Sequence, residues 1–170
     1  NISQDDQYIG QPPRTNSDTQ PFMRYNMFSL PSDAITHKRG TVNENGYPEI
    51  ILSSADSYFL QAEAAVKGIG SGDAQALFQS GIREAMKLWG VSGDTYIANE
   101  DLADISTGTM EEKLEKIAMQ RWIASYTDGF EAWAVVRDTG YPRELAVGVS
   151  DATIFSLGTL NGAYPQRLRY

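Results

Sequence analysis

Residues 120–133, "QRWIASYTDGFEAW", decide the fold of the middle of the chain, because they join two amphipathic segments through a polar turn. The stretch contains two tryptophans, a tyrosine, a phenylalanine, an arginine and two carboxylates. Aromatic rings and carboxylates are what a carbohydrate site needs, and they are also what a helix junction contains. The flanking residues distinguish these two interpretations.

Two capping patterns favour the helix junction. Thr109 and Glu112 form a Thr-x-x-Glu capping box, which predicts the start of one helix. Asp128 and Glu131 repeat the pattern with Asp in the first position, and they predict the start of the next helix. Both carboxylates of the quoted stretch therefore have a structural role, and we expect its aromatic side chains to face mostly inward.

Another pair of helices is predicted upstream. Apolar residues recur at helical spacing from about 48 to 67, and again from about 73 to 90 after the turn "KGIGSGD". The apolar faces are Ile51, Ala55, Tyr58, Phe59, Ala62, Ala65 and Val66 in the first helix, and Ala74, Leu77, Phe78, Ile82, Ala85, Met86 and Trp89 in the second. The two helices are expected to form an antiparallel hairpin. The turn lacks a preceding strand and a following Gly-Lys-Ser/Thr, so it does not predict a phosphate-binding loop.

The predicted fold is all-α, with tetratricopeptide-like helical hairpins and long irregular flanking loops. We expect a single domain over residues 1–170. Its parts are a loop-rich flank at 1–47, a helical hairpin at 48–90, a connection with one short helix at 91–108, a second hairpin at 109–139 and an irregular tail at 140–170.

Composition excludes several classes of function. The 170 residues include 14 Lys and Arg against 22 Asp and Glu, a net charge of −8, which argues against a nucleic-acid partner. There is no cysteine, and the single histidine, His37, has no neighbouring ligand-type pair, so we expect no metal site and no cofactor. No apolar run approaches the roughly 20 residues that span a bilayer, and the first residues lack a signal-peptide pattern.

The carboxylates do not predict catalysis. Glu111, Glu112 and Glu115 are clustered, but Lys113 and Lys116 lie between them, as on a solvated and ion-paired helix face. No carboxylate lies in an apolar run that would raise its pKa enough for a general acid. The chain is therefore expected not to be an enzyme.

Two arginines in the helix junction have expected structural partners. Arg121 and Arg137 lie on the apolar sides of their helices, so each is expected to face a carboxylate or to stack on a ring. Asp128, Glu131 and loop carbonyls are the expected partners, in preference to a ligand.

Three segments resemble one protein family. "EIILSSADSYFLQAEAAVKG" (49–68), "KLEKIAMQRWIASYTDGFEAWAVVRDTGYP" (113–142) and the closing "YPQRLRY" are similar to the SusD/RagB family of outer-membrane nutrient-binding lipoproteins of Bacteroidetes. The resemblance covers about 48–170. The sequence departs from the family at Asp56, where Glu is usual, and at Asp138, where a second Arg is common.

The resemblance implies non-catalytic binding of a glycan or another nutrient at the cell surface. The ligand would then pass to a SusC-like TonB-dependent transporter. The protein is expected at the outer membrane, held by a lipid anchor on an upstream segment outside this chain. In this family ligand contacts come chiefly from loops and often from aromatic residues, which makes candidates of Phe22, Tyr25, Phe28, Tyr47 and Tyr96. The alternative is a helical-repeat scaffold that binds only other proteins.

Overall fold

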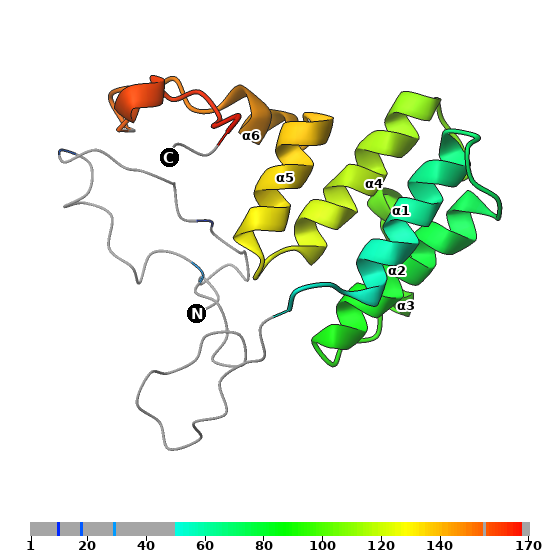
Figure 1. The fold of residues 1–170 in the computed structure, drawn as a ribbon. Coiled ribbons are helices and arrows are strands. Elements are labelled where there is room, and N and C mark those ends of the chain that lie inside the picture. Colours follow the sequence, from blue (N-terminus) through cyan, green and yellow to red (C-terminus); the bar gives the residue numbers. More distant parts are fainter. Residues whose placement is uncertain (1–9, 11–17, 19–28, 30–49, 155, 168–170) are drawn as a thin grey trace, which may run out of the picture. The chain divides into compact units, whose positions relative to one another are not determined.

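The computed structural model describes residues 10, 18, 29, 50–154 and 156–167. In these residues all regular structure is helical, with six α-helices, two short 3-10 helices and no strand (Figure 1). This confirms the predicted all-α class. None of the helices in the described part of the chain has the length and apolar character that a bilayer-spanning segment needs.

The chain divides into two compact units. One comprises residues 50–147 with 166–170, and the other comprises residues 1–49 with 148–165. The first carries all six described α-helices, and we call residues 50–147 the helical unit.

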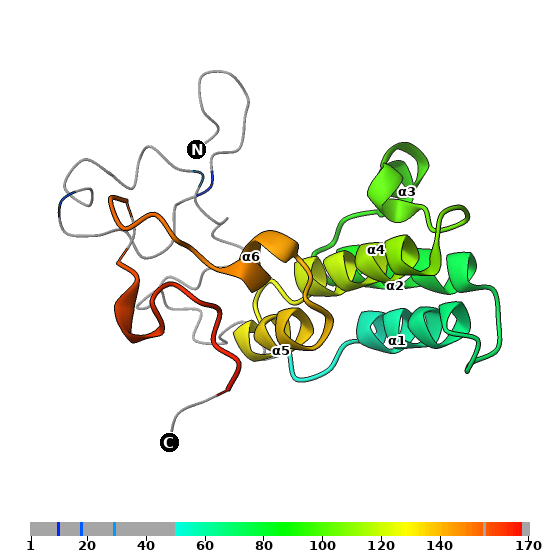
Figure 2. The same ribbon diagram turned by 90° about the horizontal axis from the view of Figure 1, so that it is seen from above.

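The first hairpin of the helical unit consists of α1 (Ser54–Val66) and α2 (Ala74–Leu88) (Figures 1 and 2). The rings of Phe59 and Phe78, both fully buried, have centroids 6.0 Å apart and are tilted by 57°. Gly81 on α2 faces the Phe59 ring so closely that an added Cβ would lie 2.6 Å from it. The helices pack tightly because one contact position has no side chain, and the predicted antiparallel hairpin is confirmed.

The start of α1 differs from the prediction. The helix begins at Ser54 and not near residue 48, because Ser53 caps it. The Ser53 hydroxyl accepts a hydrogen bond from the Asp56 N–H at 3.2 Å, and the Asp56 carboxylate accepts one from the Ser53 N–H at 3.1 Å. Ile51 therefore lies outside the helix and is 88% exposed, so its predicted place on the apolar face is wrong.

The connection between the hairpins contains α3 (Asp94–Asn99) and a 3-10 helix, η3 (Asp101–Ala103). Ala103 and Ile105 are buried in the main core, which α1, α2 and α4 complete. The buried members of this core are Ala55, Phe59, Ala62, Phe78, Ile82, Ala103, Ile105 and Ile117. The connection is thus part of the packed structure.

The second hairpin consists of α4 (Met110–Ala124) and α5 (Gly129–Thr139). The predicted Thr109–Glu112 capping box is present at the start of α4. Helix α4 contacts α1, α2 and α5, whereas α5 contacts α4 and the short α6. In Figure 1, α4 lies between α5 and α1. The second hairpin therefore joins the first mainly through α4.

The tail is less irregular than predicted. Residues Arg143–Val147 form α6, a helix of five residues whose Leu145 and Ala146 N–H groups bond to the Pro142 carbonyl at 3.1 Å. A single turn is too short to produce a recognisable hydrophobic period, which is why the sequence pattern missed it.

In the second unit the described residues form turns and one 3-10 helix, η4 (Gly158–Leu160). The Val149 N–H bonds to the Gly162 carbonyl at 3.0 Å, which brings the two ends of this segment together. Gly148 and Gly162 have φ of 81° and 78°, and a Cβ on either would lie within 2.2 Å of a carbonyl oxygen. Glycine is needed at both positions.

Candidate functional site

Arg121 is the central polar residue of the second hairpin. It projects from α4, and its side chain is only 12% exposed. Its Nη2 donates to the Glu131 carboxylate on α5 at 3.1 Å, and its Nη1 lies 3.5 Å from the Glu63 carboxylate on α1. The guanidinium thus links α1 and α5 across α4, as expected of an arginine that faces carboxylates.

Glu131 has one of its two predicted roles. The Asp128 carboxylate caps α5 as expected, since its Oδ1 accepts hydrogen bonds from the N–H groups of Phe130 at 3.1 Å and Glu131 at 3.0 Å. The Glu131 carboxylate does not complete a capping box, because it pairs with Arg121. The tertiary ion pair has replaced the local backbone contact.

One donor of Arg121 remains unsatisfied. Its Nε is buried and has no hydrogen-bond partner within the described residues. A buried donor without an acceptor costs about 1–3 kcal/mol, so such groups are uncommon in folded proteins.

A groove lies beside Arg121 with a volume of about 230 Å³. It is formed by the segment before α1, by α1 and α2, by the end of α4 and by the start of α5. Its residues are Ile50, Ile51, Leu52, Ser53, Asp56, Leu60, Leu88, Arg121, Ala124, Ser125, Thr127, Asp128 and Glu131. We call it the end groove, because the starts of α1 and α5 and the ends of α2 and α4 meet at this end of the helical unit (Figure 1).

A smaller cavity of about 130 Å³ lies nearer the start of α4. Its lining is mostly polar and acidic: Glu63, Lys67, Glu111, Leu114, Ala118, Asp138, Thr139 and Tyr141. The Tyr141 hydroxyl donates to the Glu111 carboxylate and accepts a hydrogen bond from Arg143 at 2.8 Å. The hydrogen bond to Glu111 is the main cause of the raised pKa of Tyr141. These contacts fix the start of α6 on α4.

The aromatic side chains of residues 120–133 do not all face inward. Trp122 packs against a second core cluster, and Trp133 lies under the Arg137 guanidinium, 4.8 Å from the ring centroid. Tyr126 and Phe130, however, are 60% and 74% exposed. Tyr126 lies in the turn between α4 and α5, and Phe130 lies in the first turn of α5. The expectation of mostly inward rings is wrong for these two residues.

The sequence-predicted ligand contacts are not brought together in the described structure. Phe22, Tyr25, Phe28 and Tyr47 lie outside the described residues, as does His37. Tyr96 lies on α3, where its partly buried ring packs on the main core and its hydroxyl accepts a hydrogen bond from the Gln120 side chain at 2.8 Å. Its role in ligand binding remains a prediction.

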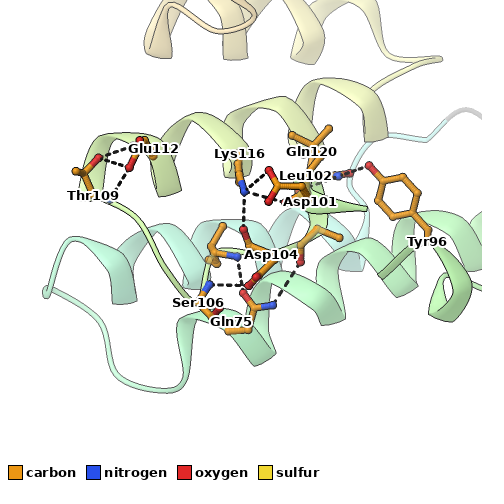
Figure 3. Close-up of polar contacts among 12 residues, drawn as sticks. Gln75, Tyr96, Asp101, Leu102, Asp104, Ser106, Thr109, Glu112, Lys116 and Gln120 are labelled. Atoms are coloured by element: carbon orange, nitrogen blue, oxygen red, sulfur yellow. Dashed lines mark hydrogen bonds and ion pairs between the residues drawn. The ribbon is translucent and has the colours of Figure 1, made fainter. Parts of the chain in front are cut away.

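A polar network that sequence reasoning missed fixes the connection between the hairpins (Figure 3). The Lys116 ammonium donates to the Asp101 and Asp104 carbonyls at 2.8 and 2.9 Å, and to the Asp101 carboxylate at 2.8 Å. The Gln75 side chain accepts from the Ile105 N–H at 2.7 Å. Their partners are 12–30 residues away in sequence, so no local pattern signals them.

The pKa shifts of the described carboxyl groups are those of hydrogen-bonded carboxylates. Each one whose pKa clearly departs from its ordinary value is shifted downward, chiefly by hydrogen bonds; these groups are Glu84, Asp94, Asp104, Glu112 and Asp151. General-acid catalysis needs a shift in the opposite direction. No cluster of three or more His, Cys, Asp or Glu that would hold a metal ion occurs in the described part of the chain.

Stacked helical hairpins with a groove at one end define a helical-repeat scaffold of the tetratricopeptide-like class. The sequence matches the SusD-like family, described as "Starch-binding associating with outer membrane", over residues 3–170. The chain belongs to the SusD-like family. The match extends upstream of residue 48, and the description names binding, which agrees with the expectation that the chain is not an enzyme.

The fold is also similar to a solved structure described as "Bacteroidetes AC2a SusD-like". The two sequences are 30% identical, and the TM-score is 0.60. The similarity covers 71% of this chain and 24% of the other, so the chain spans about a quarter of that protein's length. No curated protein matches the chain.

Proposed function

We propose that the chain is part of a non-catalytic binding protein that captures a glycan, or another nutrient, at the bacterial outer-membrane surface. The observation that carries the proposal is the match of residues 3–170 to a family described as starch-binding and associated with the outer membrane. A SusC-like TonB-dependent transporter is the proposed recipient of the ligand. A lipid anchor is the proposed means of attachment.

The helical unit serves as the scaffold of this function. Phe59 and Phe78 are fully buried in the main core and cannot stack on a sugar. The ring of Tyr96 is only partly buried, so it is the one predicted contact in the described residues with an accessible edge. Phe22, Tyr25, Phe28 and Tyr47 remain proposed contacts for the same reason as before: glycan sites use aromatic rings.

Calorimetric titration of the natural full-length protein with a glycan panel that includes malto-oligosaccharides tests the proposal. Saturable binding without release of shorter products is expected. Binding by none of the glycans would overturn the glycan ligand, and release of products would overturn the non-catalytic assignment.

Two variants at Tyr96 sharpen the test. Tyr96→Ala removes the ring, whereas Tyr96→Phe keeps the ring and removes only the hydrogen bond with Gln120. If the ring stacks on the ligand, Tyr96→Ala weakens binding about tenfold, which corresponds to about 1.4 kcal/mol, and Tyr96→Phe binds as the wild type does. Equal binding by all three proteins would remove Tyr96 from the proposed site.

A helical-repeat scaffold that binds only other proteins is the alternative. The observation that favours it is the exposed apolar surface around the end groove. Loss of all glycan binding together with retained protein partners would support this alternative.

A further inference from the structure

Exposed apolar side chains are concentrated at one end of the helical unit. The described residues include eleven large apolar side chains that are exposed, and eight of them lie at the end that carries the end groove. These eight are Ile51, Leu52, Leu60, Leu88, Val91, Ile123, Tyr126 and Phe130. Four of them, Ile51, Leu52, Leu60 and Leu88, line the end groove, and exposed apolar side chains gathered around a groove favour an interaction site.

The opposite end of the same unit is built differently. There the Lys116 network and the Thr109–Glu112 capping box provide hydrogen-bond partners for backbone groups of the connection and of the start of α4 (Figure 3). Ile69 and Met110 are the exposed apolar residues at that end; Ile69 lies in the turn between α1 and α2, and Met110 is the first residue of α4. The concentration at the end groove is therefore a local property and not a general feature of the fold.

The charges of the end groove favour a cationic partner. Its lining contains the carboxylates of Asp56, Asp128 and Glu131 against the single guanidinium of Arg121. The capping hydrogen bonds of Asp128 use only its Oδ1. The chain as a whole carries a net charge of −8, which adds to the attraction of a basic segment.

The lining of the groove also distinguishes a peptide from a sugar. None of the residues that form the groove is aromatic, and the apolar ones are aliphatic or alanine. Sugars bind on aromatic faces, whereas aliphatic pockets accept aliphatic side chains.

We propose that the end groove binds a segment of a partner protein in which an aliphatic side chain lies next to a basic residue. The aliphatic side chain enters between Leu60 and Leu88, and the basic residue lies against Asp128 and Glu131. The inference rests on the groove alone and does not require the glycan function proposed above.

Two pairs of variants separate the effect of the groove from the effects of the overall charge and of exposed apolar surface elsewhere. Ile51→Ser changes an 88% exposed isoleucine at the groove, and Ile69→Ser changes an 81% exposed one at the opposite end. Asp128→Asn and Asp73→Asn each remove one charge from a helix N-cap, at α5 and at α2 respectively. Asn is as good an N-cap as Asp, so the two Asp→Asn variants should fold equally well. The two isoleucine variants should also fold, because both side chains are exposed.

The probes are three fluorescein-labelled synthetic peptides about ten residues long. One alternates leucine with lysine, one alternates leucine with glutamate, and one alternates glycine with lysine. Fluorescence polarisation of each probe is measured with the full 170-residue chain and with the four variants. Circular dichroism confirms that each variant is folded.

The proposal expects saturable binding of the leucine–lysine peptide, and binding at least about tenfold weaker for the other two peptides. It further expects Ile51→Ser and Asp128→Asn to weaken binding several-fold, while Ile69→Ser and Asp73→Asn leave it unchanged. No binding of the leucine–lysine peptide, or equal loss in both members of a pair, would overturn the proposal. Displacement of the probe by malto-oligosaccharides would assign the groove to a glycan instead. The glycan titration of the wild type is a separate readout, so either proposal can fail alone.

Discussion

The two hairpins of the helical unit are held together by different forces. In the first, α1 and α2 meet through Phe59, Phe78 and the bare backbone of Gly81, and the polar contact between them is an exposed hydrogen bond from Ser54 to Glu84. In the second, α4 and α5 share a small buried cluster of Ala118, Val135 and Tyr141, and a partly buried ion pair.

The difference indicates how each hairpin is stabilised. The first buries enough apolar surface to be stable through packing, which contributes about 25 cal/mol per Å² of apolar area removed from water. The second buries less and leaves Phe130 in solvent, so it depends more on the Arg121 bridge. We therefore expect α5 to open before α1 and α2.

The largest effect is expected from Phe59→Ala. It removes a fully buried ring from the first hairpin and should lower the free energy of unfolding by about 4 kcal/mol. Phe130→Ala is the control in the second hairpin, and because that ring is 74% exposed its cost should stay under about 0.5 kcal/mol. Urea denaturation measures both values. Equal losses would show that the two hairpins do not differ as described.

A smaller loss is expected from Gly81→Ala. The new methyl group would lie 2.6 Å from the Phe59 ring, and this overpacking should cost about 2 kcal/mol even though alanine favours helix. Gly129→Ala, at the start of α5, meets nothing within 4 Å and should be neutral or slightly stabilising. Thermal unfolding compares the two. A stable Gly81→Ala protein would mean that the first hairpin is not tightly packed.

The sequence predicted the parts of this comparison that depend on local patterns. Helical periodicity, together with the capping residues Thr109 and Asp128, predicts all four main helices, and the structure adds Asp73 as the cap of α2. Two roles were predicted for Glu131, in the cap of α5 and as a partner of Arg121, and the structure shows only the ion pair with Arg121. Local rules assign a carboxylate near a helix start to the helix, and only the tertiary structure shows which contact prevails.

The candidate site was less predictable than the fold. The end groove combines residues from four helices and the segment before α1, so no sequence interval contains it. Ile51 illustrates the difficulty. Its spacing fits the apolar face of α1, yet Ser53 caps the helix, which starts at Ser54 and leaves Ile51 outside it. Tyr96 is a predicted ligand contact because it is an aromatic residue in the connection between the hairpins. In the structure its ring packs against the main core, which is formed by residues distant in sequence.

Arg121→Met tests the polar link of the second hairpin. Methionine keeps much of the volume but loses the ion pairs to Glu131 and Glu63. The loss should be about 1 kcal/mol because the Glu131 carboxylate is 40% exposed and reaches water, and Glu63 keeps Lys67 as a partner. Hydrogen exchange should accelerate most in α5, less in α1, where Glu63 keeps its ion pair with Lys67, and not in α2. Arg137→Met, which removes only a stacking contact on Trp133, serves as the control. Faster exchange in all helices would contradict a local role for Arg121.

The smallest effect concerns the pH dependence of the cap of α4. The Thr109 N–H and hydroxyl donate to the Glu112 carboxylate, and these hydrogen bonds hold the pKa of Glu112 below its ordinary value of 4.5. At a pH between the folded and unfolded pKa values, the unfolded state binds more protons. The stabilisation by Glu112 is therefore complete above the unfolded pKa and is lost as the pH falls through the folded pKa.

Glu112→Gln separates this charge from the cap itself, because glutamine also completes a capping box but does not titrate. We expect the wild type to unfold at a Tm a few degrees above that of Glu112→Gln near pH 6, and the difference to shrink towards pH 3. Calorimetry at several pH values measures it. A difference in Tm that stays constant over this range would show that the neutral hydrogen bonds, and not the charge, hold the start of the second hairpin.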